Sequence, residues 1–268
     1  MASAAAAQAP VTVGYWAIKG LGAPLRMMCM YANVPVNCEL YECTEGSEPG
    51  SFNRDSWMVQ AKPALKERNP LINLPYVIDT DGSTVVTQSN ACFLFLGRKL
   101  DLLGDGSPQQ LCACEQLLCE ATDLRNQVVG YAYSARATSA EETQRFFKSA
   151  SFILEKLEGV LKAKKTTDSL DFFVCSKASA PDFHIWELLD QLSRIAVVHA
   201  LPSPLEGFPL LGQFHRSFAE LPNNARYLAS PLHQLPMNNT SAKVGAVPEG
   251  GAWVQGQVFS WAGKGGVY

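Results

Sequence analysis

The chain has 268 residues, 47% of them hydrophobic, which is enough for one large domain or two ordinary ones. Its formal charge is −3, which argues against nucleic acid as the partner, and no apolar run is long enough to span a membrane. Eight cysteines occur without a CxxC pair or the Cys/His spacing of a zinc site, so we expect reduced thiols and no metal.

The N-terminal part predicts a strand, a loop and a helix. Residues 1–10 lack the basic and apolar segments of a secretory signal, so we interpret them as a flexible N-terminus of a cytoplasmic protein. The β-branched run Val11–Val13 predicts a buried strand, and apolar residues at helical spacing predict a helix after Pro24. Tyr15 and Trp16 stand at the end of the strand, where ligands collect in open α/β sheets. A phenol there can donate a hydrogen bond to a ligand, or it can simply anchor the sheet.

The next elements complete a βαβ–ββα pattern over residues 11–103. Residues 37–41 alternate weakly, as a second strand would, and residues 42–70 indicate a long loop with one short helix near 56–60. A strand at 73–78, the hairpin turn Asp81-Gly82 and a strand at 85–87 follow. Ser89 or Asn90 can cap a helix at 91–99. This order of elements is the thioredoxin-like arrangement.

The second half of the chain predicts helices only. After a linker at 104–108, an all-helical domain occupies residues 109–230, with capping boxes at Ser139-x-x-Glu142 and Ser179-x-x-Asp182. The expected helices cover residues 109–133, 140–164, 183–198, 209–220 and 223–228. Residues 231–268 form a C-terminal extension whose glycine-rich end carries four aromatic residues. That end could cover a pocket or a subunit boundary, or it could be a loosely ordered extension.

Several short motifs resemble those of a known enzyme family. The letters GYWAIKGL at 14–21, NLP at 73–75 and TQSNA at 87–91 resemble cytosolic glutathione S-transferases of the mu class. Arg54 and Trp57 match the family's RxxW, and Asp123 and Tyr133 match the mu pattern of two residues ten apart on a long helix. The resemblance covers roughly residues 11–247. It implies an α/β, thioredoxin-like N-terminal domain followed by an all-α helical bundle, in a homodimer.

The resemblance also assigns roles to residues. Leu74, before a cis-proline at Pro75, would offer its backbone to an extended peptide, and the TQSNA segment would hold the γ-glutamyl carboxylate at a helix N-terminus. Asp123 would reach glutathione bound to the neighbouring subunit. The glutathione-binding residues would be Tyr15, Trp16, Leu21, Arg54, Trp57, Lys62, Asn73, Leu74, Pro75, Gln88, Ser89 and Asp123, and the electrophile-binding residues Trp16, Leu21 and Tyr133.

Each motif also has a plain structural interpretation when it is taken alone. The proline could follow an ordinary trans peptide bond, the helix cap could hold no ligand, and an exposed arginine such as Arg54 is usually just solvated. Asp123 and Tyr133 could be ordinary surface and core residues of a helix. Because four separate segments agree in order and approximate spacing, we favour the functional interpretation.

The expected chemistry centres on a thiol. A free thiol has a pKa of ~8.5, so little of it is ionised at neutral pH, and a hydrogen bond from the Tyr15 hydroxyl would stabilise the thiolate and lower that pKa. Glutathione would then attack an apolar electrophile as co-substrate, without a cofactor or metal. Two alternatives remain open: a non-catalytic ligand-binding or structural relative, and a glutathione-dependent isomerase.

The chain departs from the family pattern in several places. Ala17 replaces a usual acidic residue and Lys19 a usual arginine. About three extra residues lie between Trp57 and Asn73, so Lys62 is assigned as the glutathione-contacting lysine only by approximate position. Leu71 stands where the mu class places an aromatic residue that inserts into the partner subunit, so we expect an altered dimer contact.

Overall fold

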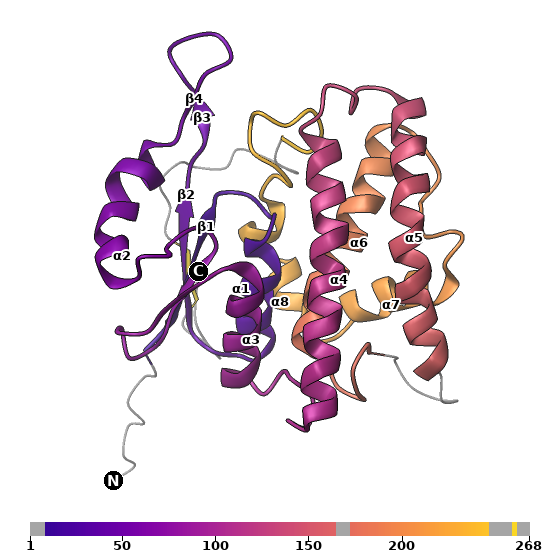
Figure 1. The fold of residues 1–268 in the computed structure, drawn as a ribbon, viewed down its shortest axis with the longest axis horizontal. Coiled ribbons are helices and arrows are strands. Elements are labelled where there is room, and N and C mark those ends of the chain that lie inside the picture. Colours follow the sequence, from indigo (N-terminus) through magenta and orange to yellow (C-terminus); the bar gives the residue numbers. More distant parts are fainter. Residues whose placement is uncertain (1–8, 165–171, 247–258, 262–268) are drawn as a thin grey trace.

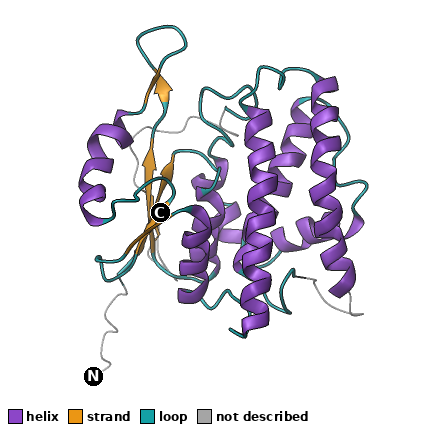
Figure 2. Ribbon diagram, viewed as in Figure 1, coloured by secondary structure: helices purple, strands orange, loops and turns teal. Residues whose placement is uncertain are grey.

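The computed structural model describes residues 9–164, 172–246 and 259–261. A mixed sheet with helices α1–α3 forms one side of the molecule, and helices α4–α7 form the other (Figures 1 and 2). The predicted combination of an α/β, thioredoxin-like domain and an all-helical domain is confirmed.

The central sheet places the predicted aromatic pair at the carboxyl end of its middle strand. Its strands stand in the order β6-β5-β1-β2-β7, with β1 parallel to β2 and each other neighbouring pair antiparallel. Tyr15 lies opposite Leu40 and Trp16 opposite Tyr41, so both aromatic residues stand at the carboxyl ends of the two parallel strands. The bounds are Val11–Trp16 (β1), Val36–Tyr41 (β2), Tyr76–Ile78 (β5), Val85–Thr87 (β6) and Phe259–Trp261 (β7).

Helices cover both faces of the sheet. Helices α1 (Gly22–Tyr31) and α3 (Ser89–Lys99) lie between the sheet and the helical domain, whereas α2 (Lys62–Arg68) lies on the opposite face (Figure 1). Of the long loop with one short helix expected at 42–70, the helix near 56–60 is present, but the remainder is not one long loop. A short hairpin of β3 (Thr44–Glu45) and β4 (Phe52–Asn53) is followed by a π-helical segment at Ser56–Ala61 that continues into α2. Pro63 falls in the first turn of α2, where its missing backbone N–H is tolerated.

The helical domain follows the predicted order. The capping box at Ser179 is present, with Asp182 accepting from both the backbone N–H and the hydroxyl of Ser179, and the Ser139 hydroxyl accepts from the Glu142 N–H. No helix within the described ranges is long and apolar enough to cross a membrane. The bounds are Pro108–Ala132 (α4), Ala140–Lys164 (α5), Ala180–Val198 (α6), Pro209–Ala219 (α7) and Ala225–Leu228 (α8), followed by a 3-10 turn at Pro231–Gln234.

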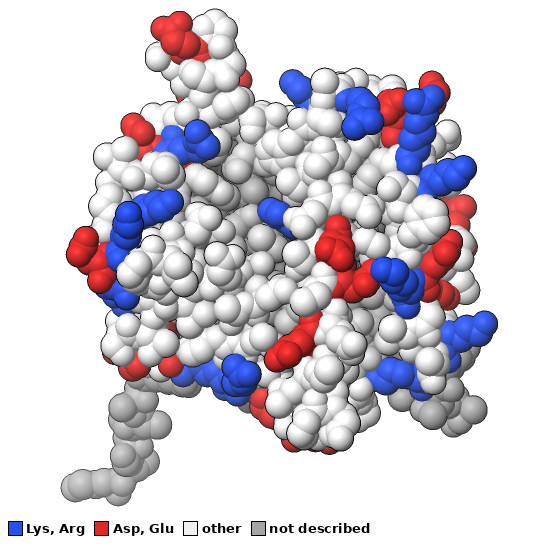
Figure 3. All heavy atoms as spheres, in the orientation of Figure 1, with Lys and Arg blue, Asp and Glu red and all other residues white. Residues whose placement is uncertain are grey.

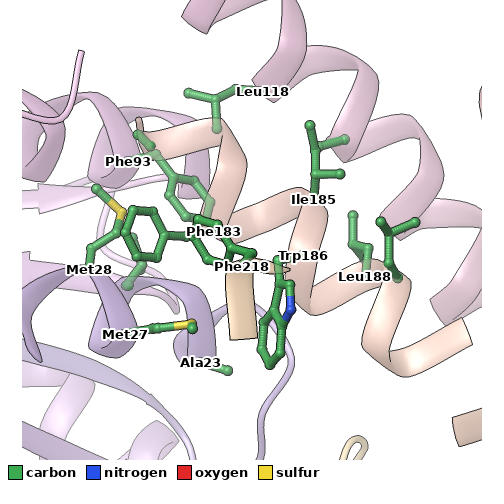
Figure 4. Packing of buried hydrophobic residues seen from close by; sticks show 14 of the residues in the cluster. Ala23, Met27, Met28, Phe93, Leu118, Phe183, Ile185, Trp186, Leu188 and Phe218 are labelled. Atoms are coloured by element: carbon green, nitrogen blue, oxygen red, sulfur yellow. The ribbon is translucent and has the colours of Figure 1, made fainter. Parts of the chain in front are cut away.

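One apolar core joins the two domains. Helix α6 is almost entirely buried and packs against α1, α3 and α4. In Figure 4, Met28 of α1 lies beside Phe183 of α6, and Phe93 of α3 lies close above them. Because these side chains belong to one continuous cluster, the sheet and the bundle are held in a fixed relation. All eight cysteines are free.

Strand β7 is a part of the C-terminal extension that the sequence did not predict as a strand. It pairs with Val36–Cys38, the amino-terminal half of β2 and therefore the end remote from Tyr15. Trp261 is buried, and the Arg226 guanidinium lies 5.2 Å from the centre of its ring. This part of the extension covers a sheet edge, not the end of the sheet where Tyr15 lies. The rest of the segment 249–268 falls outside the described residues.

Candidate functional site

The loop after β1 is held by its own backbone and by a buried arginine. The Lys19 N–H donates to the Pro236 carbonyl at 2.7 Å, which attaches the loop to the segment after the helical domain. The Arg26 guanidinium, fully buried in α1, donates to the carbonyls of Ile18 and Trp16 at 3.0 and 3.1 Å. These bonds fix the backbone on the carboxyl side of Tyr15.

Two glycines make room for the Tyr15 side chain. Gly20 has a φ of +38°, and a Cβ there would lie 2.8 Å from a ring carbon of Tyr15 and 3.1 Å from its hydroxyl oxygen. A Cβ on Gly22 would lie 2.8 Å from the Tyr15 Cβ and 2.7 Å from a nitrogen of Arg26. The loop can approach Tyr15 this closely only because both positions lack a side chain.

A pocket of about 310 Å³ opens in front of Tyr15, between the two domains. The space-filling view shows a hollow on this face of the molecule, with basic atoms visible inside it (Figure 3). The lining residues come from the β1 end and its loop (Tyr15, Trp16, Ile18, Gly20), from the segment before α2 (Cys43, Arg54), from α4 and its C-cap (Arg125, Val129, Tyr133) and from the segment after the helical domain (Asn238, Asn239, Ser241).

Two tyrosine hydroxyls are available in this pocket. The Tyr15 ring is only 4% exposed, and its hydroxyl has no hydrogen-bond partner among the residues that the structure describes. The Tyr133 hydroxyl accepts a hydrogen bond of 2.8 Å from the Asn239 backbone N–H, so its own proton is still free to donate. Burial raises the pKa of Tyr133, which the bond from Asn239 partly offsets, so the phenol stays protonated at neutral pH.

In the segment before β5, the backbone N–H and carbonyl of one residue, Leu74, are unpaired among the described residues. The Leu74–Pro75 bond is cis, as the resemblance implied. The Thr87 hydroxyl donates to the Asn73 carbonyl at 2.8 Å and accepts from the Asn73 N–H at 3.1 Å, so the backbone of Asn73 is already occupied. The backbone N–H and carbonyl of Leu74 make no hydrogen bond to any described residue. Leu74 is therefore the residue that can pair with an extended ligand.

The N-terminus of α3 differs from the expectation in one detail. Gln88, not Ser89 or Asn90, is the N-cap residue, and it has a φ of +72°; Ser89 is the first helical residue. The first N–H that bonds back into the helix is that of Cys92, to the Gln88 carbonyl at 2.9 Å. The N–H groups of the preceding turn are therefore free to bind an anion.

Most of the remaining predicted residues do not line the pocket. Arg54 lines it, but Trp57 is only 1% exposed and stacks on Tyr76 in a small second core. The Lys62 ammonium lies 5.9 Å from the centre of the Trp57 ring. Asp123 is exposed on α4, outside the pocket lining.

Leu21 packs beneath Tyr15 in a small cluster with Ile18, and it does not line the pocket. The binding roles of Leu21, Trp57, Lys62 and Asp123 stay predictions.

Sequence reasoning missed several lining residues. Arg125 and Val129 precede Tyr133 by eight and four residues, so helical spacing from Tyr133 could have found them. Asn239 is 106 residues from Tyr133 in the chain, and no local signal links the two. Cys43 also lines the pocket; burial raises the pKa of its thiol, and the charge of Arg54 partly opposes this effect.

Comparisons with known proteins all find similarity to glutathione S-transferases. Residues 122–231 match the profile of the family described as "Glutathione S-transferase, C-terminal domain". The chain is 32% identical over 222 residues to glutathione S-transferase Mu 1 of Oryctolagus cuniculus, with 82% of this chain and 91% of the relative covered. It is 28% identical to glutathione S-transferase Mu 3 of Homo sapiens, with 90% and 98% covered. The crystal structure of the glutathione S-transferase Blo t 8 shares the fold, with a TM-score of 0.67, 24% identity and coverage of 87% of this chain and 99% of that one.

Proposed function

The chain belongs to the glutathione S-transferase family, as a mu-like member, and we propose that it conjugates the glutathione thiolate to apolar electrophiles. The observation that carries this proposal is the position of Tyr15. Its hydroxyl lies at the carboxyl end of β1, lines the interdomain pocket and has no partner among the described residues. A thiol bound there would meet a hydrogen-bond donor that no described group competes for.

Tyr15 acts on the sulfur without forming a bond to it. Its hydroxyl donates a hydrogen bond to the thiolate, which stabilises the charged form and lowers the pKa of the bound thiol, while the thiol proton leaves to solvent. The thiolate then attacks the electrophilic carbon: a carbon–sulfur bond forms, and the leaving group departs or a carbon–carbon double bond is converted into an enolate that takes up a proton. No covalent enzyme intermediate is required.

Glutathione is proposed to bind as an extended peptide along the sheet. Its cysteinyl backbone pairs with the free N–H and carbonyl of Leu74, next to Pro75, with Asn73 and Gln88 beside it. Its γ-glutamyl carboxylate lies at the N-terminus of α3, at Ser89. Its glycyl carboxylate lies towards Arg54, with Trp57 and Lys62 completing that end.

The protein is proposed to act as a cytoplasmic homodimer in detoxification. In this arrangement Asp123 of one subunit reaches glutathione held by its partner, which agrees with its exposed position on α4. Leu71, at the position of the mu-class contact residue, has 74% of its surface exposed and is available to a partner subunit. Trp16 and Tyr133, which line the pocket, contact the electrophile; Leu21 is assigned to the same site by the resemblance alone and supports it from below.

The test is turnover of an aryl halide with glutathione, measured together with calorimetric binding of glutathione. The proposal predicts both binding and an S-conjugate as product. Binding without conjugation of several electrophiles would contradict it, and would indicate an isomerase if free glutathione were returned, or a carrier if no reaction occurred. Absence of binding would indicate a structural role for the fold.

A further inference from the structure

Helix α4 forms one wall of the pocket, and the side chain at one end of that wall is the cationic Arg125. Arg125, Val129 and Tyr133 follow one another at intervals of four residues, lie on one side of the helix and all line the pocket. Eight residues correspond to about 12 Å along a helix axis. The wall therefore presents a hydroxyl at one end, an apolar side chain in the middle and a guanidinium at the other end.

The Arg125 guanidinium has no acidic partner in the described part of the chain. The side chain is half-buried, and the hydrogen bond it makes there goes to the neutral amide oxygen of Asn126, at 3.2 Å. Asp123, two residues earlier, is exposed and forms no ion pair with it. A half-buried guanidinium with only a neutral acceptor has unused donors that match a carboxylate.

The pocket as a whole carries an uncompensated positive charge. Its charged lining residues are Arg54 and Arg125, and no aspartate or glutamate of the described chain lines it. Such a pocket attracts anions. In the proposed glutathione pose one carboxylate lies at the N-terminus of α3 and the other lies towards Arg54. Arg125, on the opposite domain, is therefore left for the second substrate.

We propose that Arg125 selects electrophiles that have an apolar body and a carboxylate at the end remote from the reacting carbon. This inference rests on the proposed function and names the class of its second substrate. The reacting carbon lies between the glutathione sulfur and the Tyr133 hydroxyl, the apolar body packs on Val129, and the carboxylate forms a two-pronged pair with the guanidinium. The purely apolar electrophile expected from the sequence is thereby refined to an amphipathic one.

A matched pair of substrates tests the assignment. The probes are an aryl enone with a para-carboxylate and its methyl ester, which share the same reacting carbon. The measured quantity is the ratio of kcat/KM for the acid to that for the ester, each corrected for its uncatalysed rate with glutathione. The wild type should prefer the acid about tenfold or more, as a charge-assisted pair implies.

Three variants distinguish an effect of the Arg125 guanidinium in the pocket from a general effect of the protein's net charge. Arg125→Gln should remove the preference for the acid, and Arg125→Lys, which keeps the charge but not the planar fork, should retain part of it. Arg98→Gln, an exposed arginine of α3 outside the pocket, removes the same net charge and should keep the wild-type ratio. An unchanged ratio in Arg125→Gln, or an equal fall in Arg98→Gln, overturns the inference. If the ratio is unchanged and the KM for glutathione is raised in Arg125→Gln, the inference is also overturned, because Arg125 would then serve glutathione and not the second substrate.

A binding measurement distinguishes this inference from the proposed function. The saturated ketone forms of the two probes cannot react with a thiol, and their affinities can be measured by calorimetry. If neither enone is turned over but the saturated acid binds the wild type at least tenfold more tightly than Arg125→Gln, the transferase proposal fails and the role of Arg125 stands. If the enones are turned over and the saturated acid binds both proteins equally, the inference fails and the transferase proposal stands.

Discussion

The Lys19 ammonium lies 3.9 Å from a carboxylate oxygen of Asp190, and this pair connects the loop behind Tyr15 to helix α6. The Lys19 side chain is fully buried, and the Asp190 carboxylate also accepts from Arg194 at 2.6 Å. Burial lowers the pKa of Lys19, and the charges of Glu187 and Asp190 oppose that shift. Because one partner comes from each domain, the pair helps to fix the site loop against the bundle.

Breaking this pair should destabilise the fold. Asp190→Asn removes the carboxylate that pairs with both Lys19 and Arg194 and leaves only the more distant charge of Glu187 to act on the buried Lys19 ammonium, so we expect a loss of about 3 kcal/mol in the free energy of unfolding. Denaturant unfolding followed by circular dichroism measures it. The control is Asp101→Asn, which breaks the exposed pair with Lys177 and should cost less than about 1 kcal/mol. Equal losses in the two variants would contradict the role given to the buried pair.

Removing the Tyr15 hydroxyl should impair turnover more than binding. In Tyr15→Phe the ring that packs the loop is kept and only the donor to sulfur is lost. We expect retained glutathione affinity, a raised pKa of the bound thiol and a fall in kcat at neutral pH. Thiolate absorbance titrated with pH, alongside kcat, reports both quantities. Unchanged turnover at neutral pH would remove Tyr15 from the assigned role.

A methyl group at Gly20 should displace the Tyr15 ring. In Gly20→Ala the new Cβ would lie 2.8 Å from that ring, so turnover should fall. Gly82→Ala is a matched control, because Gly82 also has a positive φ, +69°, but nothing lies within 4 Å of its added Cβ. Both variants should lose about 1 kcal/mol of stability from backbone strain, and only Gly20→Ala should lose activity. Equal kcat values in the two variants would show that the close approach is unimportant.

His184 should make the protein sensitive to acid. Burial lowers the pKa of His184 to about 3, and the charge of Arg125 adds to this effect. Between about pH 6.5 and pH 3 the unfolded chain binds a proton that the folded chain does not, so stability is lost as the pH falls.

Replacing this histidine should remove part of that sensitivity. The ring nitrogens of His184 have no partner among the described residues, so His184→Leu leaves no polar group unsatisfied. Between pH 6.5 and pH 5 the variant should lose about 2 kcal/mol less stability than the wild type. Denaturant midpoints at several pH values measure this difference. Parallel pH profiles would refute the assignment.

Strand β7 should contribute to stability and not to catalysis. Trp261 is buried against the Arg226 guanidinium, so Trp261→Ala should lower the free energy of unfolding by about 3 kcal/mol while kcat/KM is unchanged. Ser260→Ala, an exposed position of the same strand, keeps the pairing and should match the wild type. A change in electrophile preference with Trp261→Ala would instead link this strand to the pocket.

Much of the fold could be predicted because it depends on neighbours in the chain. β-branched runs, the Asp81-Gly82 turn and the Ser179 capping box act over a few residues, and each was found where expected. The position of Tyr15 at the end of a buried strand follows from the same local pattern. The short helix expected near 56–60 continues to residue 68, and Pro63 is compatible with this because it falls in the first turn of α2.

The sequence by itself thus determined the fold class, the strand-end tyrosine and three of the segments that line the pocket: the end of β1 with its loop, the segment with Arg54 and the end of α4 with Tyr133. Only the tertiary structure decided that Asn239 bonds to Tyr133, that Lys19 meets Asp190, that Trp57 is buried beside Tyr76 and that Phe259–Trp261 extends the sheet. These contacts join residues far apart in the chain. They depend on how complete surfaces pack together, which no local pattern of residues encodes.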